Sequence, residues 1–125
     1  MKRFALLCCF AVLFLCSAAG AGDKPASEPF HVHFIVVPAF MPDGMDSGPA
    51  VELFKAEVLG LTGGYTQLGR ATGGSMGGGG IQGEDNIAFL IGAKTDVSVK
   101  LKEIAQRLFG AKGVFIMAWP GTVTF

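Results

Sequence analysis

Apolar and polar side chains alternate with a changing period along most of the chain, and each period predicts one kind of secondary structure. Residues 30–37 (FHVHFIVV) are rich in β-branched and aromatic side chains and end at Pro38, which predicts a strand. Residues 86–92 (NIAFLIG) and 113–119 (GVFIMAW) are nearly continuous apolar runs, which are typical of buried strands. A more mixed segment over 65–72 predicts one further strand.

Two other segments repeat their apolar residues at the period of an α-helix. The first follows Ser47, a favourable N-cap, and ends near Gly60. The second follows Asp96, which also suits a helix start, and ends at Gly110. The apolar residues of this second helix lie at i, i+3, i+4 and i+7: Leu101, Ile104, Ala105 and Leu108.

The resulting order of strand, helix, strand, strand, helix, strand over residues 30–125 is that of the α+β ferredoxin-like fold, the split βαβ pattern. Right-handed crossovers then place both helices on one face of a four-stranded antiparallel sheet with strand order 4-1-3-2. The glycine tract 73–80, with Gly83, predicts a flexible connection between the second and third strands. Pro120 is expected to break the last strand.

The predicted sheet is apolar on both faces, which a two-layer monomer does not require. In the first strand, Phe30, Val32, Phe34 and Val36 form one face, and the other carries His31 and His33 before Ile35 and Val37. We expect the histidine side to be the free face. Covering a second apolar face calls for another surface, which predicts a homo-oligomer, most simply a dimer. Alternatively, the chain termini or the glycine tract fold over that face.

The first 21 residues have the pattern of a cleavable secretory signal peptide. Lys2 and Arg3 precede a run of thirteen apolar residues over 4–16, shorter than the roughly 20 of a membrane-spanning helix. Small residues follow, and we expect cleavage after Ala21. Residues 22–29 then form a flexible polar tether, and the protein is exported to the periplasm or the cell exterior, with the membrane a transient partner.

A lipoprotein is the competing interpretation of this leader, with Cys16 as the lipid-modified residue. The bulky Leu15 disfavours it, because the residue before such a cysteine is normally small. All three cysteines lie in the leader, so the mature chain cannot form a disulfide.

The charge of the mature chain excludes two classes of partner. From residue 23 onward it carries eight Lys and Arg against ten Asp and Glu, a formal net charge of −2 without runs of like charge. Nucleic acids and anionic membranes both require a concentrated basic surface. We therefore expect no nucleic-acid partner.

Two features carry candidate chemistry, and neither completes a catalytic motif. His31 and His33 share one strand face and could begin a metal site or supply a general base, but no further ligand stands at a suitable spacing, so we expect no metal. The glycine tract could order over a ligand, with Arg70, Met76 and Gln82 as contacts. Because it joins two strands and lacks the GxGxxG order, we expect no nucleotide or other cofactor.

The element order, the turn Gly60-Leu61-Thr62 and the apolar runs NIAFLIGA and GVFIMAW resemble small exported ferredoxin-like proteins of an uncharacterised bacterial family. A looser resemblance is to PII-like signalling proteins, which implies trimers and nucleotide binding beside a long loop between the second and third strands. This sequence departs from that pattern, since it lacks a phosphate-binding lysine and arginine set after the second helix.

These observations predict an exported, non-enzymatic, oligomeric binding or structural domain. The alternative is a small enzyme of the dimeric α/β-barrel type that uses His31 or His33 as general base. An enclosed pocket reached by a histidine would favour the enzyme, and a packed core would favour binding.

Overall fold

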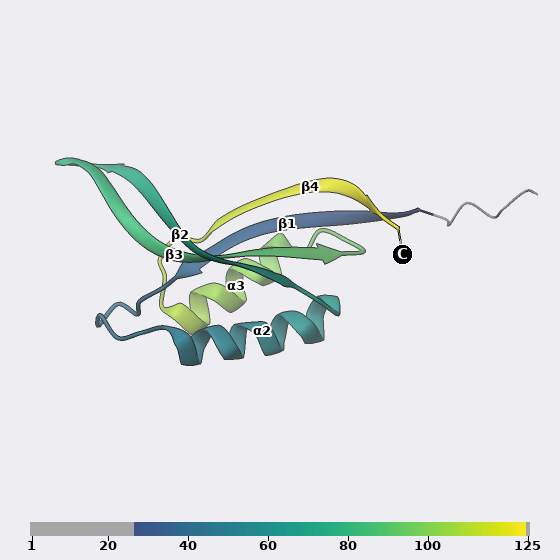
Figure 1. Ribbon diagram of the computed structural model, residues 1–125, viewed down its shortest axis with the longest axis horizontal. Helices are drawn as coiled ribbons and strands as arrows, with labels where there is room; N and C mark the ends of the chain where they lie inside the picture. The colour runs from purple at the N-terminus through teal and green to yellow at the C-terminus, as the bar shows by residue number, and fades with distance from the viewer. Residues whose placement is uncertain (1–26, 125) are drawn as a thin grey trace, which may run out of the picture.

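The computed structural model describes residues 27–124, which form one antiparallel sheet and two helices (Figure 1). The elements are β1 Glu28–Pro38, α2 Gly48–Thr62, β2 Thr66–Gly77, β3 Gly80–Ala93, α3 Ser98–Phe109 and β4 Phe115–Val123. The strand order is β2-β3-β1-β4, which confirms the predicted 4-1-3-2 order and the ferredoxin-like fold. The predicted signal peptide, Cys16 and the first part of the tether lie outside the described residues.

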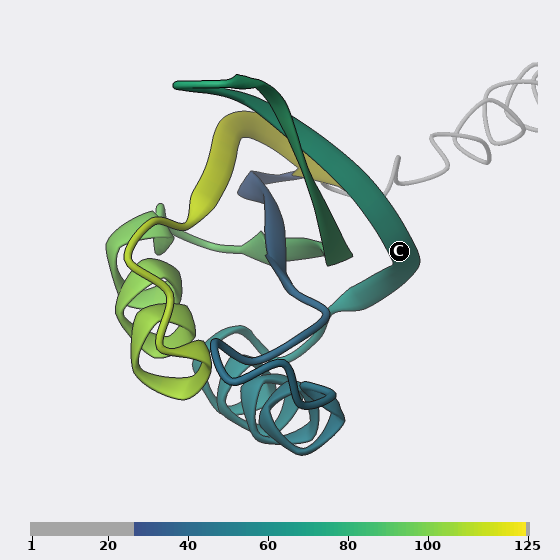
Figure 2. The same ribbon diagram turned by 90° about the vertical axis from the view of Figure 1, so that its left-hand side faces the viewer.

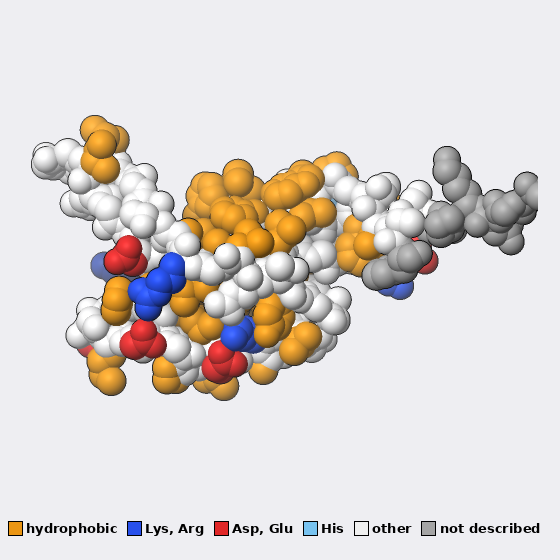
Figure 3. All heavy atoms as spheres, in the orientation of Figure 1, with side chains coloured by type: hydrophobic (Ala, Val, Ile, Leu, Met, Phe, Trp, Pro, Cys, Tyr) orange, Lys and Arg blue, Asp and Glu red, His pale blue; other side chains and the backbone are white. Residues whose placement is uncertain are grey.

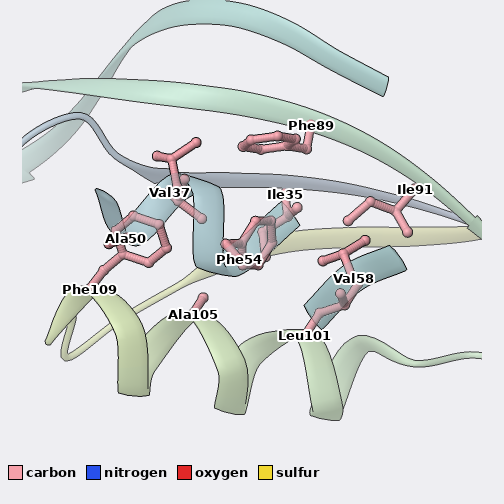
Figure 4. Close-up of a cluster of buried hydrophobic side chains, with 11 residues drawn as sticks. Ile35, Val37, Ala50, Phe54, Val58, Phe89, Ile91, Leu101, Ala105 and Phe109 are labelled. Carbon is pink, nitrogen blue, oxygen red and sulfur yellow. The ribbon is translucent and has the colours of Figure 1, made fainter. Parts of the chain in front are cut away.

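Both helices pack against the same face of the sheet, and the core fills the space between the layers (Figures 1 and 4). Phe54 of α2 stacks against Phe89 of β3 and Phe109 of α3, with ring centroids 5.3 and 6.0 Å apart. The remaining core residues are aliphatic: Ile35, Val37, Ala50, Val51, Val58, Ile91, Leu101 and Ala105. The amphipathic faces predicted for the two helices are therefore the faces that they bury.

The prediction for the two sheet faces is wrong in one respect, because the histidine side of β1 faces the helices. His33, Ile35 and Val37 are fully buried, whereas Phe34 and Val36 are only partly covered. Both sets of side chains are apolar enough to pack inside, so alternation alone does not distinguish them. The outcome depends on His33, whose ring nitrogens find hydrogen-bond partners on β3 and in the connection before α3.

The glycine tract is also different from the prediction, because it forms an ordered hairpin rather than a flexible connection. Strand β2 continues to Gly77, a two-residue turn follows, and β3 begins at Gly80. Gly80 has φ +120°, a conformation that glycine adopts readily. The distal half of this hairpin rises beyond the body of the domain and away from the helices (Figures 1 and 2).

Several element ends also differ from the sequence prediction. Helix α2 passes through Gly60 and ends at Gly63, whose φ is +84° and whose N–H donates to the carbonyl of Leu59. Strand β1 begins at Glu28, two residues inside the predicted tether, and β4 continues past Pro120 to Val123. An edge strand tolerates proline because one of its sides has no partner. Neither helix of the described residues is long and apolar enough to cross a membrane.

Candidate functional site

The sheet face opposite the helices carries exposed apolar side chains, and we call it the open face. Its central rows are set by strand register: Val36 of β1 lies opposite Phe115 of β4, Phe34 opposite Met117, and Val32 opposite Trp119. On the other side of β1, Ala88, Leu90 and Gly92 of β3 complete the same rows. Hydrophobic side chains gather over this part of the sheet (Figure 3).

The β4 side chains of the open face are the ones most exposed to water. Phe115 is 56% exposed, Met117 48% and Trp119 42%. Phe115 stands edge-on to Phe34 of β1, with ring centroids 6.4 Å apart. These rows contain no charged residue, so this part of the face offers apolar contact and little polar recognition.

Two glycines lie on the open face beside the first residues of β1, Gly92 opposite Val32 and Gly121 opposite Phe30. A Cβ on Gly92 would lie 3.0 Å from the Phe30 ring, and one on Gly121 would lie 3.0 Å from a methyl group of Val32. The absence of side chains there lets Phe30 and Val32 lie close to the sheet. A hollow of about 440 Å³ adjoins them, lined by both residues, Leu90 and Tyr65, among others.

A second hollow, of about 380 Å³, lies where the open face meets the hairpin. Phe34, Val36 and Phe115 line it from the sheet, and the strand segment 71–75 lines it from β2. Asn86 also lines it and is buried, with its side-chain amide donating to the carbonyl of Glu84 at 3.3 Å. Gly73 leaves room for that amide, since a Cβ there would approach it to 3.1 Å.

The tip of the β2–β3 hairpin is apolar and fully in water. Met76 and Ile81 lie opposite each other across the two strands, and each is 81% exposed. Between them, residues 77–80 are all glycine. The hairpin is therefore a narrow ribbon of backbone with one exposed apolar pair at its end.

The five residues predicted to bind a ligand do not form one site. His31 pairs with Ala93 at the end of β3, whereas Gln82 pairs with Ser75 near its start, in the hairpin with Met76. Arg70 lies 3.9 Å from a carboxylate oxygen of Asp46 and 5.9 Å from the centre of the Phe40 ring. It thus ties β2 to the β1–α2 connection, and its role in ligand binding stays a prediction.

The two histidines lie on the same strand face, as predicted, with ring centroids 6.5 Å apart. His33 is fully buried, and its Nδ1 lies 3.3 Å from the carbonyl oxygen of Ile91. Its Nε2 lies 3.1 Å from Oδ1 of Asp96 and accepts a hydrogen bond from the Val97 amide at 3.1 Å. A third hollow, of about 460 Å³, lies between Pro38, Phe109 and Lys112, and no histidine lines any of the three hollows.

Asp96 is the titratable group whose pKa is most altered at this place. Its Oδ1 accepts hydrogen bonds from the hydroxyl and the amide of Ser98, and the imidazole of His33 is beside it. These contacts, those of Ser98 first, lower the pKa of the carboxyl from 3.8 to about 2. The sequence indicated Asp96 as a helix cap but gave no sign of its contact with His33, because the two residues stand 63 positions apart.

Within residues 27–124, no three His, Cys, Asp or Glu side chains gather in a way that could hold a metal ion. Of the two histidines, only His33 is hydrogen-bonded to Asp96, and the carboxylate of Asp96 is itself exposed.

Comparison with known proteins places the fold and leaves the activity open. The sequence matches no family model and no curated protein. The divalent cation tolerance protein CutA1 from Thermus thermophilus has a similar structure, with a TM-score of 0.56 and 18% identity over 72% of this chain and 82% of that one.

Two further CutA structures agree with it. CutA from the bacterium Xylella fastidiosa gives a TM-score of 0.55 at 18% identity, covering 72% of this chain and 81% of that chain. CutA1 from Oryza sativa gives 0.52 at 16% identity, covering 75% and 81%. All three structures support the ferredoxin-like fold of this chain. At these identities the likeness concerns the fold alone.

Proposed function

We propose that the domain is a non-enzymatic binding or structural protein that works as a homo-oligomer, with the open face as the contact between copies. The observation that carries this proposal is the row of Phe115, Met117 and Trp119, three large apolar side chains about half exposed on one strand. A contiguous apolar patch of this kind marks an interaction surface in soluble proteins.

A second copy of the chain is the partner that this chemistry fits best. The central rows of the open face carry no charge, so an acidic or basic partner would find nothing to pair with there. An identical apolar face would bury both patches at once, with a gain of about 25 cal/mol for each Å² of apolar surface removed from water. A dimer is the simplest assembly, and a trimer is the one that the PII-like resemblance implies.

The hairpin supports the same proposal as a second contact region. Its exposed pair Met76 and Ile81 lies beyond the body of the domain, where a neighbouring copy is within reach. Because residues 77–80 carry no side chains, the ribbon behind this pair allows close approach of another backbone.

The test is the mass of the purified protein in solution, measured by size-exclusion chromatography with light scattering at micromolar concentration. We expect a multiple of the monomer mass for the wild type. Trp119→Glu places a carboxylate in the centre of the contact and should yield the monomer, because a buried unpaired charge is costly. Met117→Glu provides a second variant should the first one fail to fold.

Leu53→Glu is the matched control. Leu53 lies on α2 and is as exposed as Phe115, but it is in the helix layer rather than on the open face. Its replacement should leave the oligomer intact. A wild-type protein that is strictly monomeric at these concentrations would overturn the proposal.

The enzyme alternative gains no support from the interior. His33 has both ring nitrogens in hydrogen bonds and is fully buried, and the described hollows are lined by other residues. We also propose that the protein is exported after cleavage behind Ala21. The pattern of residues 1–21 supports this step.

A further inference from the structure

Nε2 of the buried His33 ring lies next to one hydrogen-bond acceptor and one hydrogen-bond donor. Oδ1 of Asp96 lies 3.1 Å away and can only accept a hydrogen bond from the ring while the carboxyl is ionised. The backbone nitrogen of Val97 also lies 3.1 Å away and can only donate. A ring nitrogen donates when it carries a proton and accepts when it does not, so Nε2 satisfies one of these partners at a time.

The other ring nitrogen, Nδ1, lies next to an acceptor. Nδ1 lies 3.3 Å from the carbonyl oxygen of Ile91, and a carbonyl oxygen only accepts. In the neutral tautomer that satisfies both the Ile91 carbonyl and the Val97 N–H, Nδ1 carries the proton. In the neutral ring Nε2 is then bare and accepts the Val97 N–H, and in the charged ring Nε2 donates to Asp96.

The neighbours of the ring on the sheet and the buried faces of the helices are largely apolar. On β1 itself, His31 is the neighbour, with ring centroids 6.5 Å apart. The residues opposite His33 are Ile91 on β3 and Ala118 on β4. The residues that the helices bury are all apolar: Ala50, Val51, Phe54 and Val58 on α2, and Leu101, Ala105 and Phe109 on α3.

We propose that His33 is a proton-operated switch at the start of α3. The neutral ring holds the amide of Val97, the residue directly before the helix, and so ties β1 to the backbone of the helix start. The protonated ring releases this amide and pairs with the Asp96 carboxylate instead. Asp96 is prepared for that role, because Ser98 already holds its carboxylate through two hydrogen bonds, at 2.6 and 2.9 Å.

Opposing forces set the balance of this switch. The N-terminal end of a helix carries a partial positive charge and disfavours a cation beside it, whereas the Asp96 carboxylate favours one. Imidazoles as a class change charge within about one to two pH units of neutrality, where modest changes in surroundings decide the charge. Protonation of the His33 ring is the event that would change the partner of Nε2.

Two-dimensional ¹H–¹⁵N spectra of the purified protein, recorded from pH 8 to pH 4, test the proposal directly. At pH 8 we expect the His33 ring to be the tautomer with its proton on Nδ1. As the pH falls, the His33 ring nitrogens and the Val97 amide should change together with one midpoint. Loss of the hydrogen bond should also lower the protection of the Val97 amide from hydrogen exchange by about fivefold or more, measured at each pH relative to the intrinsic exchange rate at that pH.

Two variants separate this switch from other titrations. Asp96→Asn removes the anionic partner at an exposed position, so the change at the Val97 amide should move to lower pH. His31→Gln removes the other imidazole and should leave the Val97 change in place. A proton on Nε2 at pH 8 would overturn the proposal. So would a Val97 amide that stays constant while His33 titrates, or a His33 ring that stays neutral until the protein unfolds.

Discussion

The exposed carboxyl group of Asp96 has a lowered pKa because of the groups around it. A single oxygen of this side chain accepts hydrogen bonds from the Ser98 hydroxyl and amide and lies beside the His33 ring. Each of these contacts stabilises the charged form of the carboxyl, and together they lower its pKa from 3.8 to about 2. The folded protein thus binds this proton less readily than the unfolded chain does.

A pH dependence of stability follows, and its sign is set by that lowered pKa. The contribution of Asp96 to folding is complete above about pH 4 and is lost as the pH falls through about 2. Asp96→Asn has no carboxyl to titrate. The difference in unfolding free energy between wild type and variant should therefore shrink from pH 5 to pH 2, as urea midpoints at several pH values would show.

Ser98→Ala provides the control for this measurement, because it keeps the carboxylate and removes its strongest partner. When Asp96→Asn is introduced into the Ser98→Ala variant, the resulting change in unfolding free energy should depend less on pH than it does in the wild type. A wild-type to Asp96→Asn difference that is constant between pH 5 and pH 2 would contradict the assignment.

The contact between His33 and Asp96 could not be predicted from the sequence, because the two residues stand 63 positions apart. The spacing of His31 and His33 correctly predicted that their rings share a face. The face itself was predicted wrongly, because a histidine packs inside only when its nitrogens find partners. Those partners, Ile91, Asp96 and Val97, come from another strand and the connection that follows it.

At the scale of elements, the end of α2 illustrates how similar local signals compete. Gly60, Gly63 and Gly64 all suit the end of a helix, and the sequence favours the first. The helix instead continues to Thr62, whose hydroxyl lies 2.9 Å from the carbonyl oxygens of both Val58 and Gly64 and has one hydrogen to donate to them. Gly63 then takes the left-handed conformation, with φ +84°.

Two substitutions distinguish these glycines. Gly60→Ala removes a flexible residue from an exposed helical position with open space around it and should stabilise the protein by about 0.5–1 kcal/mol. Gly63→Ala forces a Cβ into the left-handed region and should cost about 1–2 kcal/mol. Urea unfolding of both variants gives the two values, and equal effects would mean that the helix does not end at Gly63.

The hairpin was hidden from sequence reasoning for a related reason. Glycine is depleted in strands, so the tract 73–80 predicted a flexible connection. The side chains of β3 compensate for the missing ones on β2. A Cβ on Gly74 would touch Ile81 at 3.4 Å, and one on Gly77 would collide with the side chain of Gln82.

At the scale of the whole molecule, the order of elements and of strands could be predicted, because the apolar periods of 30–37, 86–92 and the two helices are long and clear. The second apolar face was also visible in the sequence, and within residues 27–124 one apolar sheet face has exposed side chains. The similarity to CutA structures agrees with the same fold.

Export is a property of the whole chain and leads to a separate prediction. Expressed with its own leader in a bacterial host, the protein should appear outside the cytoplasm with a new N-terminus at Gly22, which intact-mass spectrometry would measure. Ala21→Leu should block that cleavage, whereas Ala18→Leu, away from the −3 and −1 positions, should not. A protein recovered from the cytoplasm at full length would contradict the proposal, and a lipid-modified Cys16 would identify a lipoprotein.

The glycine hairpin has one more consequence, for survival among proteases. Protruding tips are the usual sites of nicking, and this one extends well clear of the domain. Yet no lysine or arginine occurs between Arg70 and Lys94. Trypsin-like enzymes cleave after a lysine or arginine of the substrate, which occupies their specificity pocket. They therefore find no cleavage site between Arg70 and Lys94. The sequence of the protruding hairpin, rather than burial, thus protects it from these enzymes.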